Sequence, residues 1–210
     1  MHCYMDLIIR ADSRSEAGML ISEAFSRLHS GIQQIAPGRI GVAFPNIQEG
    51  DAPHPGNVLR VFGSKEELDS LRNLDGLTHL ERAGGLVRGK ILTVPGDHGW
   101  VRFVRDRVVE RATDEAIART EARFIERYRA MHNREPTQKE IQQRRRALRQ
   151  REGKRPFLRL RSSSTGYLFS VHIRREPGSQ EVKVDRFSGY GLSPAHGPCL
   201  PDFPTAEPSL

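Results

Sequence analysis

Three groups of side chains in this sequence have the types needed for proton transfer at a phosphate ester. His29 follows Leu28 directly and lies four positions beyond Phe25, at the rim of an apolar helix face. A run of hydroxyl residues occupies 162–165 (SSST), and Tyr190 lies within GYGLS. A lone imidazole suits the transesterification of RNA, because the RNA brings its own nucleophile, the 2′-hydroxyl. The protein then only has to remove a proton, protonate the leaving oxygen and hold the in-line geometry.

Each of these groups also has an interpretation without chemistry, and the residues alone leave both open. His29 can be a boundary histidine that packs and does nothing more. The run at 162–165 can be the polar turn of a β-hairpin, where Ser and Thr are common. Tyr190 can pack in the core or at a sheet edge. Catalysis is therefore a hypothesis that other parts of the chain must support.

Several other kinds of site lack support in the sequence. The chain contains no GxxxxGK[ST] segment and no GxGxxG opening a helix, the patterns typical of nucleotide sites, and no serine in a G-x-S-x-G setting. None of the eight histidines has another at i+3 or i+4, and Cys3 and Cys199 are far apart with no CxxC spacing. We therefore expect no metal, no cofactor and two reduced thiols.

The positive charge of the chain is concentrated in one segment. Residues 100–161 hold 19 Lys and Arg against 9 Asp and Glu, whereas the rest of the chain holds 14 against 17. A local excess of this kind is typical of a polyanion site. Nucleic acid is favoured over a membrane, because QQRRRALRQR at 142–151 offers only Ala147 and Leu148 as apolar residues. The alternative is a solvated helical face without a ligand.

Residues 1–95 predict two helices set between strands. Apolar residues recur at spacings of three and four from Ala17 to Ile35, which indicates one buried helix face. Ser64 and Glu67 form a capping box that opens a second helix ending near Leu74. Strands are expected at 4–10, 39–45 and 57–63, with one or two more at 77–83 and 89–95. The order β-α-β-β-α-β predicts an α+β protein with a ferredoxin-like (RRM-like) N-terminal domain.

The composition changes at Pro95–Gly99, and residues 96–193 predict a small antiparallel sheet and two helices. One helix is expected over 114–131, and a capping box of Thr137 and Glu140 opens an arginine-rich helix after it. Strands are expected at 100–105, 157–161, 167–174, 181–187 and 189–193.

Three parts of the chain are predicted from these patterns. Residues 1–95 form the ferredoxin-like domain with the candidate histidine, and 96–193 form a domain with the arginine-rich helix. The tail at 194–210 contains five prolines and is expected to be flexible. No apolar run is long enough to span a membrane and the N-terminus does not read as a signal peptide, so we expect a cytoplasmic protein.

Four stretches of the sequence resemble one known family. They are RLHSGI around His29, RIGVAFP at 39–45, RPFLRLRSSSTGYLFSVHIRR at 155–175 and SGYGLS at 188–193. In this order, and over most of the chain, they resemble the CRISPR type I-F pre-crRNA-processing endoribonucleases, which cut repeat hairpins and belong to the Csy complex. The resemblance implies a ferredoxin-like N-terminal domain, a C-terminal domain with an arginine-rich helix, and cleavage that needs no metal.

The resemblance also implies roles for individual residues. His29 would be the catalytic base or proton shuttle, Ser162 would orient the 2′-hydroxyl, and Tyr190 would support the site. Three further residues would contact RNA beside the cut, namely Ser164 and Thr165 at the phosphate and Phe169 stacked on a base at the foot of the stem. The implied products carry a 2′,3′-cyclic phosphate and a 5′-hydroxyl.

Arginines of the charged segment are the residues expected to bind the RNA hairpin. In the linker, Phe103 and Arg105 stand where the family usually has an Arg and a Gln. The expected basic contacts are Arg102, Arg105, Arg107, Arg144, Arg145, Arg149 and Arg151. A helix can enter the narrow major groove of A-form RNA where a short stem meets its loop. The arginine-rich helix would then be short of apolar residues because it packs on the stem.

Partners follow from the same resemblance. They are the CRISPR repeat hairpin, which stays bound after cleavage, and other subunits of the type I-F crRNA-guided surveillance complex. One alternative is a catalytically silent subunit that binds the crRNA hairpin, and another is a basic DNA-binding or ribosome-associated protein. The presence of both His29 and Ser162 favours the endoribonuclease.

Overall fold

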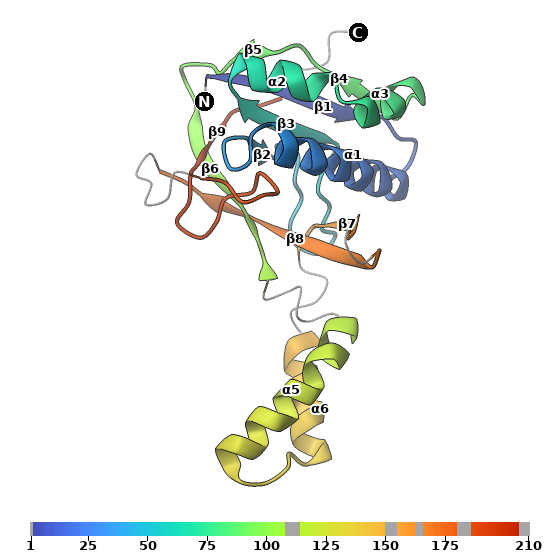
Figure 1. The fold of residues 1–210 in the computed structure, drawn as a ribbon, viewed down its shortest axis with the longest axis vertical. Coiled ribbons are helices and arrows are strands. Elements are labelled where there is room, and N and C mark those ends of the chain that lie inside the picture. The colour runs from blue at the N-terminus through green and yellow to red at the C-terminus, as the bar shows by residue number, and fades with distance from the viewer. Residues whose placement is uncertain (1, 108–113, 150–154, 163–165, 180–185, 206–210) are drawn as a thin grey trace.

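The computed structural model describes residues 2–107, 114–149, 155–162, 166–179 and 186–205, without the side chains of 114–116, 119, 120, 148 and 149. Within these ranges the chain forms five helices and two antiparallel sheets, so the predicted α+β class is confirmed. Three helices and the two sheets form one body, and the other two helices extend from it as a helical hairpin (Figure 1).

The first sheet is built from the N-terminal part of the chain. Its strands follow the order β2-β3-β1-β4, and β5 also pairs with β1. All of these pairings are antiparallel. The strands are β1 (Cys3–Ile9), β2 (Gly41–Ala43), β3 (Val58–Gly63), β4 (Leu86–Arg88) and β5 (Leu92–Thr93). The strands predicted within 4–10, 39–45 and 57–63 are confirmed.

The long helix α1 (Arg14–Ile35) carries the candidate histidine. It begins after Ser13, whose hydroxyl accepts a hydrogen bond from the Glu16 N–H at 3.2 Å. Its buried face follows the predicted spacing of three and four, with Ile21, Ala24, Phe25, Leu28 and Ile32. Beside it on the sheet packs α2 (Lys65–Arg72), which begins with the predicted capping box at Ser64.

Residues 77–83 form part of a helix, so the strand predicted there is wrong. Helix α3 (Asp75–Arg82) buries Leu77, and Leu80 packs against the same core. A spacing of three places both leucines on one helix face, and Asp75 in the first turn suits the positive end of the helix dipole. The spacing of three between Leu77 and Leu80 was the signal for a helix, because an alternating strand would place the two leucines on opposite faces.

The second sheet comes from the C-terminal part of the chain and has the strand order β7-β8-β6-β9. Its strands are β6 (Gly99–Arg105), β7 (Phe157–Arg161), β8 (Leu168–Pro177) and β9 (Leu200–Asp202). Strand β7 lies along α1, where the Arg159 N–H donates to the Ser22 hydroxyl at 3.1 Å. The rings of Phe44 and Phe103 lie 5.6 Å apart between the sheets. One hydrophobic core therefore contains residues from both sides of the boundary predicted after residue 95.

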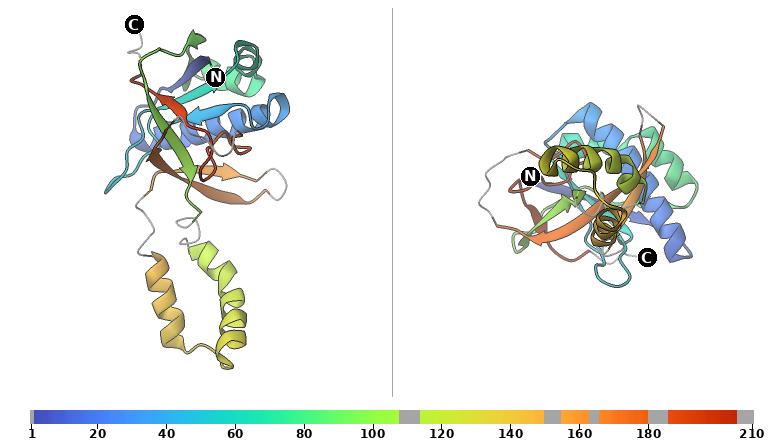
Figure 2. Two further views of the ribbon diagram at one scale, coloured as in Figure 1. Left: turned by 90° about the vertical axis from the view of Figure 1, so that its left-hand side faces the viewer. Right: turned by 90° about the horizontal axis from the view of Figure 1, so that it is seen from below.

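The helical hairpin consists of α5 (Asp114–His132) and α6 (Gln138–Arg149), which run antiparallel and connect at the end far from the body (Figure 2). Both helices were predicted. The capping box is present, because the Thr137 N–H donates to the Glu140 carboxylate at 2.7 Å and the Glu140 N–H donates to the Thr137 hydroxyl at 3.3 Å. No helix in the described part of the chain has the length and apolarity of a membrane span.

The segment after Pro194 is structured as far as residue 205, which corrects the expectation of a flexible tail over 194–210. Strand β9 pairs with β6, and Leu200 is fully buried. Arg60 also donates from Nη1 to the Phe203 carbonyl oxygen at 2.7 Å. Proline is compatible with an edge strand, so Pro201 does not prevent pairing. Residues 206–210 lie outside the described residues.

Residues 189–193 form a turn with a single β-bridge rather than the predicted strand. The Gly191 N–H donates to the Ser188 carbonyl at 2.8 Å, and Ser193 bridges Val104. Gly191 has a φ of +73°, a left-handed conformation that glycine adopts without strain. Of the strand predicted at 181–187, residues 181–185 lie outside the described residues.

Candidate active site and RNA-binding surface

His29 lies on α1 beside the turn that contains Gly189. Its Nδ1 is 2.8 Å from the Gly189 carbonyl oxygen, and the residue is half-buried. A carbonyl oxygen can only accept a hydrogen bond, so Nδ1 carries the proton in this contact. Nε2 of the neutral ring then keeps its lone pair. The imidazole is thus held in a tautomer that can accept a proton at Nε2.

Tyr190 forms one wall of the histidine site. Its ring stacks on the imidazole with a centroid distance of 4.2 Å and an interplanar angle of 18°. The same ring lies parallel to Phe25, with a centroid distance of 6.3 Å. Phe25 is buried in the core, so the core supports the tyrosine and the tyrosine supports the imidazole. This placement is compatible with the supporting role predicted for Tyr190.

Arg105 connects this ring pair to Phe169. Its guanidinium carbon lies 5.4 Å from the Tyr190 ring centroid and 5.9 Å from that of Phe169, within the range of cation–π attraction. Arg105 is the last residue of β6, whereas Phe169 lies on β8 opposite Leu160 of β7. The structure therefore brings together four predicted residues from distant parts of the chain: His29, Arg105, Phe169 and Tyr190.

Ser162 lies where the β7–β8 hairpin turns. Its N–H donates to the Tyr167 carbonyl at 2.9 Å, and its own carbonyl accepts from the Gly166 N–H at 2.8 Å. These bonds follow the last pair of the two strands, Arg161 and Leu168. Leu160 and Phe169 pair one step earlier in the ladder, so Ser162 lies two residues beyond the position opposite Phe169.

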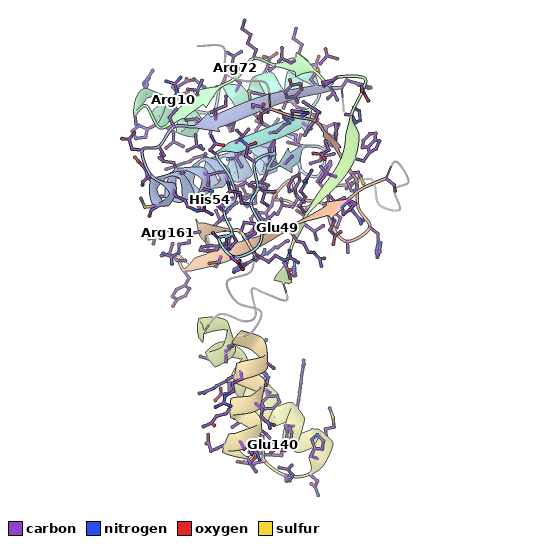
Figure 3. The ribbon with its side chains drawn as sticks, turned by 180° about the vertical axis from the view of Figure 1, so that it is seen from behind. Arg10, Glu49, His54, Arg72, Glu140 and Arg161 are labelled. Atoms are coloured by element: carbon purple, nitrogen blue, oxygen red, sulfur yellow. The ribbon has the colours of Figure 1, made fainter. Side chains whose placement is uncertain are left out.

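The remaining hydroxyl residues assigned to the phosphate, Ser164 and Thr165, lie outside the described residues. Arg161, which ends β7, is exposed and donates from Nη1 to the backbone of the turn at 3.1 Å (Figure 3). The convergence of Ser162 with His29, which the predicted reaction requires, stays a prediction.

Charged residues tie the body to the two chain segments that lead to the helical hairpin. Asp106 follows β6, and Arg155 precedes β7. Nη1 of Arg155 lies 2.8 Å from the carboxylate of Glu49, and its Nε lies 3.6 Å from that of Asp106. The Asp106 N–H donates to the His172 carbonyl at 2.8 Å. These contacts hold the end of β6 and the start of β7, from which the helical hairpin extends.

The other two linker arginines differ in their surroundings. Nη2 of Arg102 lies 3.2 Å from a carboxylate oxygen of Glu176 on the neighbouring strand. Arg107 is exposed just beyond β6. Of the three predicted linker contacts, Arg105 is therefore the one within the ring cluster.

Two of the predicted RNA-binding arginines hold α6 against α5. Arg145 donates two hydrogen bonds of 2.8 Å to Glu121. The guanidinium carbon of Arg144 lies 4.6 Å from the centroid of the Phe124 ring. Ile141 is also buried. An arginine-rich helix with few apolar residues can pack in this way, because the arginine stems and charges take part in the contact.

Three further basic residues of the helical hairpin are not among the predicted RNA contacts. Arg123 and Arg127 lie one turn apart on α5, and Arg146 lies on α6; all three are exposed. None of them pairs with an acidic residue of the described chain. The i, i+4 spacing on α5 was the available signal. The side chain of Arg149, and Arg151 as a whole, lie outside the described residues.

Glu140 organises the end of the helical hairpin that is far from the body (Figure 3). Nη2 of Arg134 donates to its carboxylate at 2.7 Å, and the Tyr128 hydroxyl and Thr137 also donate to it. These bonds, first of all that of Arg134, hold the pKa of Glu140 well below its ordinary value. The bond to Glu140 also raises the pKa of Tyr128.

Comparison with known proteins covers nearly the whole chain. Residues 4–203 match the family Cas_Csy4, described as CRISPR-associated protein. The CRISPR-associated endonuclease Cas6/Csy4 of Pseudomonas aeruginosa (strain UCBPP-PA14) is 29% identical over 197 residues, which cover 92% of this chain and 96% of that protein. The protein of the same name from Escherichia coli (strain UTI89 / UPEC) is 28% identical over 204 residues, with the same coverage of 92% and 96%. These matches confirm the resemblance found in the sequence, and the chain belongs to the Cas_Csy4 family of CRISPR-associated proteins.

Proposed function

We propose that this protein is a metal-independent endoribonuclease that cleaves CRISPR repeat hairpins in precursor crRNA. Its relatives are named CRISPR-associated endonucleases, and its net charge of +7 suits an RNA substrate. The observation that carries the proposal is the fixed imidazole of His29, bonded through Nδ1 to Gly189 and stacked on Tyr190. That arrangement presents Nε2 as the proton acceptor.

The reaction proceeds by attack of the RNA on itself. Nε2 of His29 removes the proton of the 2′-hydroxyl, and the 2′-oxygen forms a bond to phosphorus. The bond from phosphorus to the 5′-oxygen breaks, and that oxygen takes up a proton from water. The products are a 2′,3′-cyclic phosphate and a 5′-hydroxyl. Ser162 orients the 2′-hydroxyl, and Ser164 and Thr165 line the phosphate.

The RNA hairpin binds between the ring cluster and the helical hairpin. Phe169 stacks on a base at the foot of the stem, with the positive charge of Arg105 beside its ring. The charge of α5 and α6 attracts the phosphates of the stem. The proposed basic contacts are Arg102, Arg107, Arg144, Arg145, Arg149 and Arg151, to which the exposed positions add Arg123, Arg127 and Arg146.

The organisation of the chain follows the same proposal. Residues 1–95 are a ferredoxin-like domain, supported by the order β1-α1-β2-β3-α2-α3-β4 and the sheet order β2-β3-β1-β4. Residues 96–193 form the hairpin-binding domain. After cleavage the protein stays on the 3′ hairpin of the crRNA, in the cytoplasm, as a subunit of the type I-F surveillance complex.

Replacement of the histidine tests the proposal. With the repeat RNA of its own CRISPR array in EDTA, His29→Ala is expected to lower single-turnover cleavage about 10²- to 10⁴-fold, the contribution of a general acid–base group. The affinity of the protein for the RNA hairpin should stay the same. His79→Ala, an exposed histidine on α3, is the matched control and should cleave normally.

Three outcomes would contradict parts of the proposal. Normal cleavage by His29→Ala would remove that residue from the mechanism, and inhibition by EDTA would show a requirement for a metal. Hairpin binding by the unaltered protein with no cleavage product would favour the silent crRNA-binding subunit. Mapping the 3′ end of the product as a cyclic phosphate would support the 2′-hydroxyl as nucleophile.

A further inference from the structure

A second donor shares the carbonyl oxygen that holds His29. Gln33 lies on α1 four residues after His29, so both side chains leave the same side of the helix. Nε2 of Gln33 lies 2.6 Å from the Gly189 carbonyl oxygen, and Nδ1 of His29 lies 2.8 Å from the same atom. The oxygen has two lone pairs and can accept both bonds. Only the NH₂ group of Gln33 can donate, so its amide orientation is also fixed.

The turn that carries this carbonyl is packed closely against α1. A Cβ atom at Gly189 would lie 2.6 Å from Nε2 of Gln33, so a side chain there would displace the amide. Ser188 and Gly191 close the turn with a hydrogen bond of 2.8 Å, and the Gly191 carbonyl accepts from the Val42 N–H of β2 at 2.8 Å. These bonds hold the ends of the turn, and Gln33 holds the carbonyl at its centre.

We propose that Gln33 is a positioning residue that fixes the Gly189 carbonyl and thereby the Nδ1–H tautomer of His29. If the carbonyl turned away, Nδ1 would lose its acceptor and either ring nitrogen could carry the proton. Only the Nδ1–H form keeps the lone pair on Nε2, where the 2′-hydroxyl is to lose its proton. This inference rests on the proposed role of His29 as the base. Gln33 sets the fraction of enzyme that is ready to react.

Replacement of the donor tests this role. Gln33→Met removes the NH₂ group and keeps a side chain of similar length, and Gln34→Met changes the exposed neighbour on the same helix. Loss of one neutral hydrogen bond predicts a decrease of about three- to tenfold in the single-turnover cleavage rate of Gln33→Met at saturating enzyme. Hairpin affinity should not change, and Gln34→Met should cleave normally. Gln33→Lys retains an N–H donor and should restore much of the rate.

The tautomer itself can be read by ¹⁵N NMR of the full chain labelled at histidine, at a pH of about 9 where imidazoles are neutral. In the unaltered protein the His29 signals should be those of a protonated Nδ1 and an unprotonated Nε2, and in Gln33→Met they should shift toward the average of both tautomers. A role in folding alone would leave the tautomer of the folded protein unchanged.

The two proposals fail in different ways. An unchanged tautomer together with an unchanged rate in Gln33→Met would overturn the positioning role, even if His29→Ala is inactive. A cleaving His29→Ala would overturn the catalytic role of His29, whatever the tautomer.

Discussion

Pairs of arginine and carboxylate occur in both the body and the helical hairpin, and they differ in burial. In the body, the Arg60 side chain is 1% exposed and donates to both carboxylate oxygens of Asp6, at 2.7 and 2.9 Å. In the helical hairpin, the side chains of Arg134 and Glu140 are 51% and 28% exposed. A buried charge depends on its partner, whereas an exposed pair contributes little.

This difference agrees with what each region does under the proposed function. Proton transfer needs an imidazole held in one place and one tautomer, and the packed body supplies contacts to His29 from Gly189 and Tyr190. Attraction to RNA phosphates needs positive charge and tolerates motion of the side chains. Under the proposed function, the body fixes the geometry of the imidazole, while the helical hairpin supplies positive charge for the RNA.

The largest effect should come from breaking the buried pair. Arg60→Met leaves the carboxylate of Asp6 unpaired in a nearly buried site and removes the donor to the Phe203 carbonyl. Loss of one partner of a buried pair predicts a decrease of about 3–5 kcal/mol in the free energy of unfolding. Urea denaturation followed by circular dichroism measures it.

An exposed ion pair in the same body provides the matched control. Nε of Arg39 lies 2.9 Å from Glu67, but the Arg39 side chain is 69% exposed. Arg39→Met should lower the free energy of unfolding by less than about 1 kcal/mol. Similar losses for Arg39→Met and Arg60→Met would mean that burial does not separate the pairs.

A smaller effect, on RNA affinity rather than stability, should follow from removing charge on the helical hairpin. Replacing three exposed arginines with Gln should weaken hairpin binding about 10- to 100-fold at about 0.15 M salt and reduce the salt slope by about 0.9 for each phosphate that an arginine no longer neutralises. Cleavage at saturating enzyme should not change, because the imidazole is untouched. The three positions are Arg123, Arg127 and Arg146.

The control for that variant removes the same charge elsewhere. Exposed arginines of the body, changed to Gln together, should leave the salt slope nearly unaltered; they are Arg10, Arg39 and Arg82. Equal losses of affinity in both triple variants would show that net charge alone, and not its position on the helical hairpin, governs RNA binding.

The smallest effect should be a loss of hydrogen-exchange protection in the helical hairpin at acidic pH. In the folded chain the pKa of Glu140 lies below its ordinary value of 4.5. The ionised carboxylate therefore stabilises the helical hairpin at a pH above 4.5, and this contribution is lost as the pH falls below 4.5. Amides in the first turn of α6 should therefore lose hydrogen-exchange protection, corrected for the intrinsic rate, between about pH 5 and 3. Mass spectrometry of the full chain can follow it.

Two variants check the origin of that pH dependence. Glu140→Gln should have weaker protection at neutral pH and lose most of the change on acidification. Glu126→Gln, at an exposed position on α5, should behave like the unaltered protein. If Glu140→Gln retained the full pH dependence, another carboxylate would be responsible.

Local features explain most of what could be predicted. The buried face of α1 and the capping boxes at Ser64 and Thr137 depend on residues within one or two helical turns, so they can be recognised in the sequence. The strand predicted at 77–83 failed because the segment is short, and its one periodic signal, the spacing of three between Leu77 and Leu80, fits a helix and not an alternating strand. The tail was misjudged because its prolines are local, whereas the pairing of β9 with β6 is not.

The sequence by itself determined the class of fold, the charged segment, the family and the residue types of the site. Only the tertiary structure decided which of these residues meet. His29 and the Gly189 carbonyl lie 160 positions apart, and Arg105 joins Phe169 to Tyr190 across separate strands. The contact of Gln33 with the same carbonyl oxygen also became visible only there. The physical reason is that periodicity and capping act over a few residues, whereas these contacts depend on how whole elements pack.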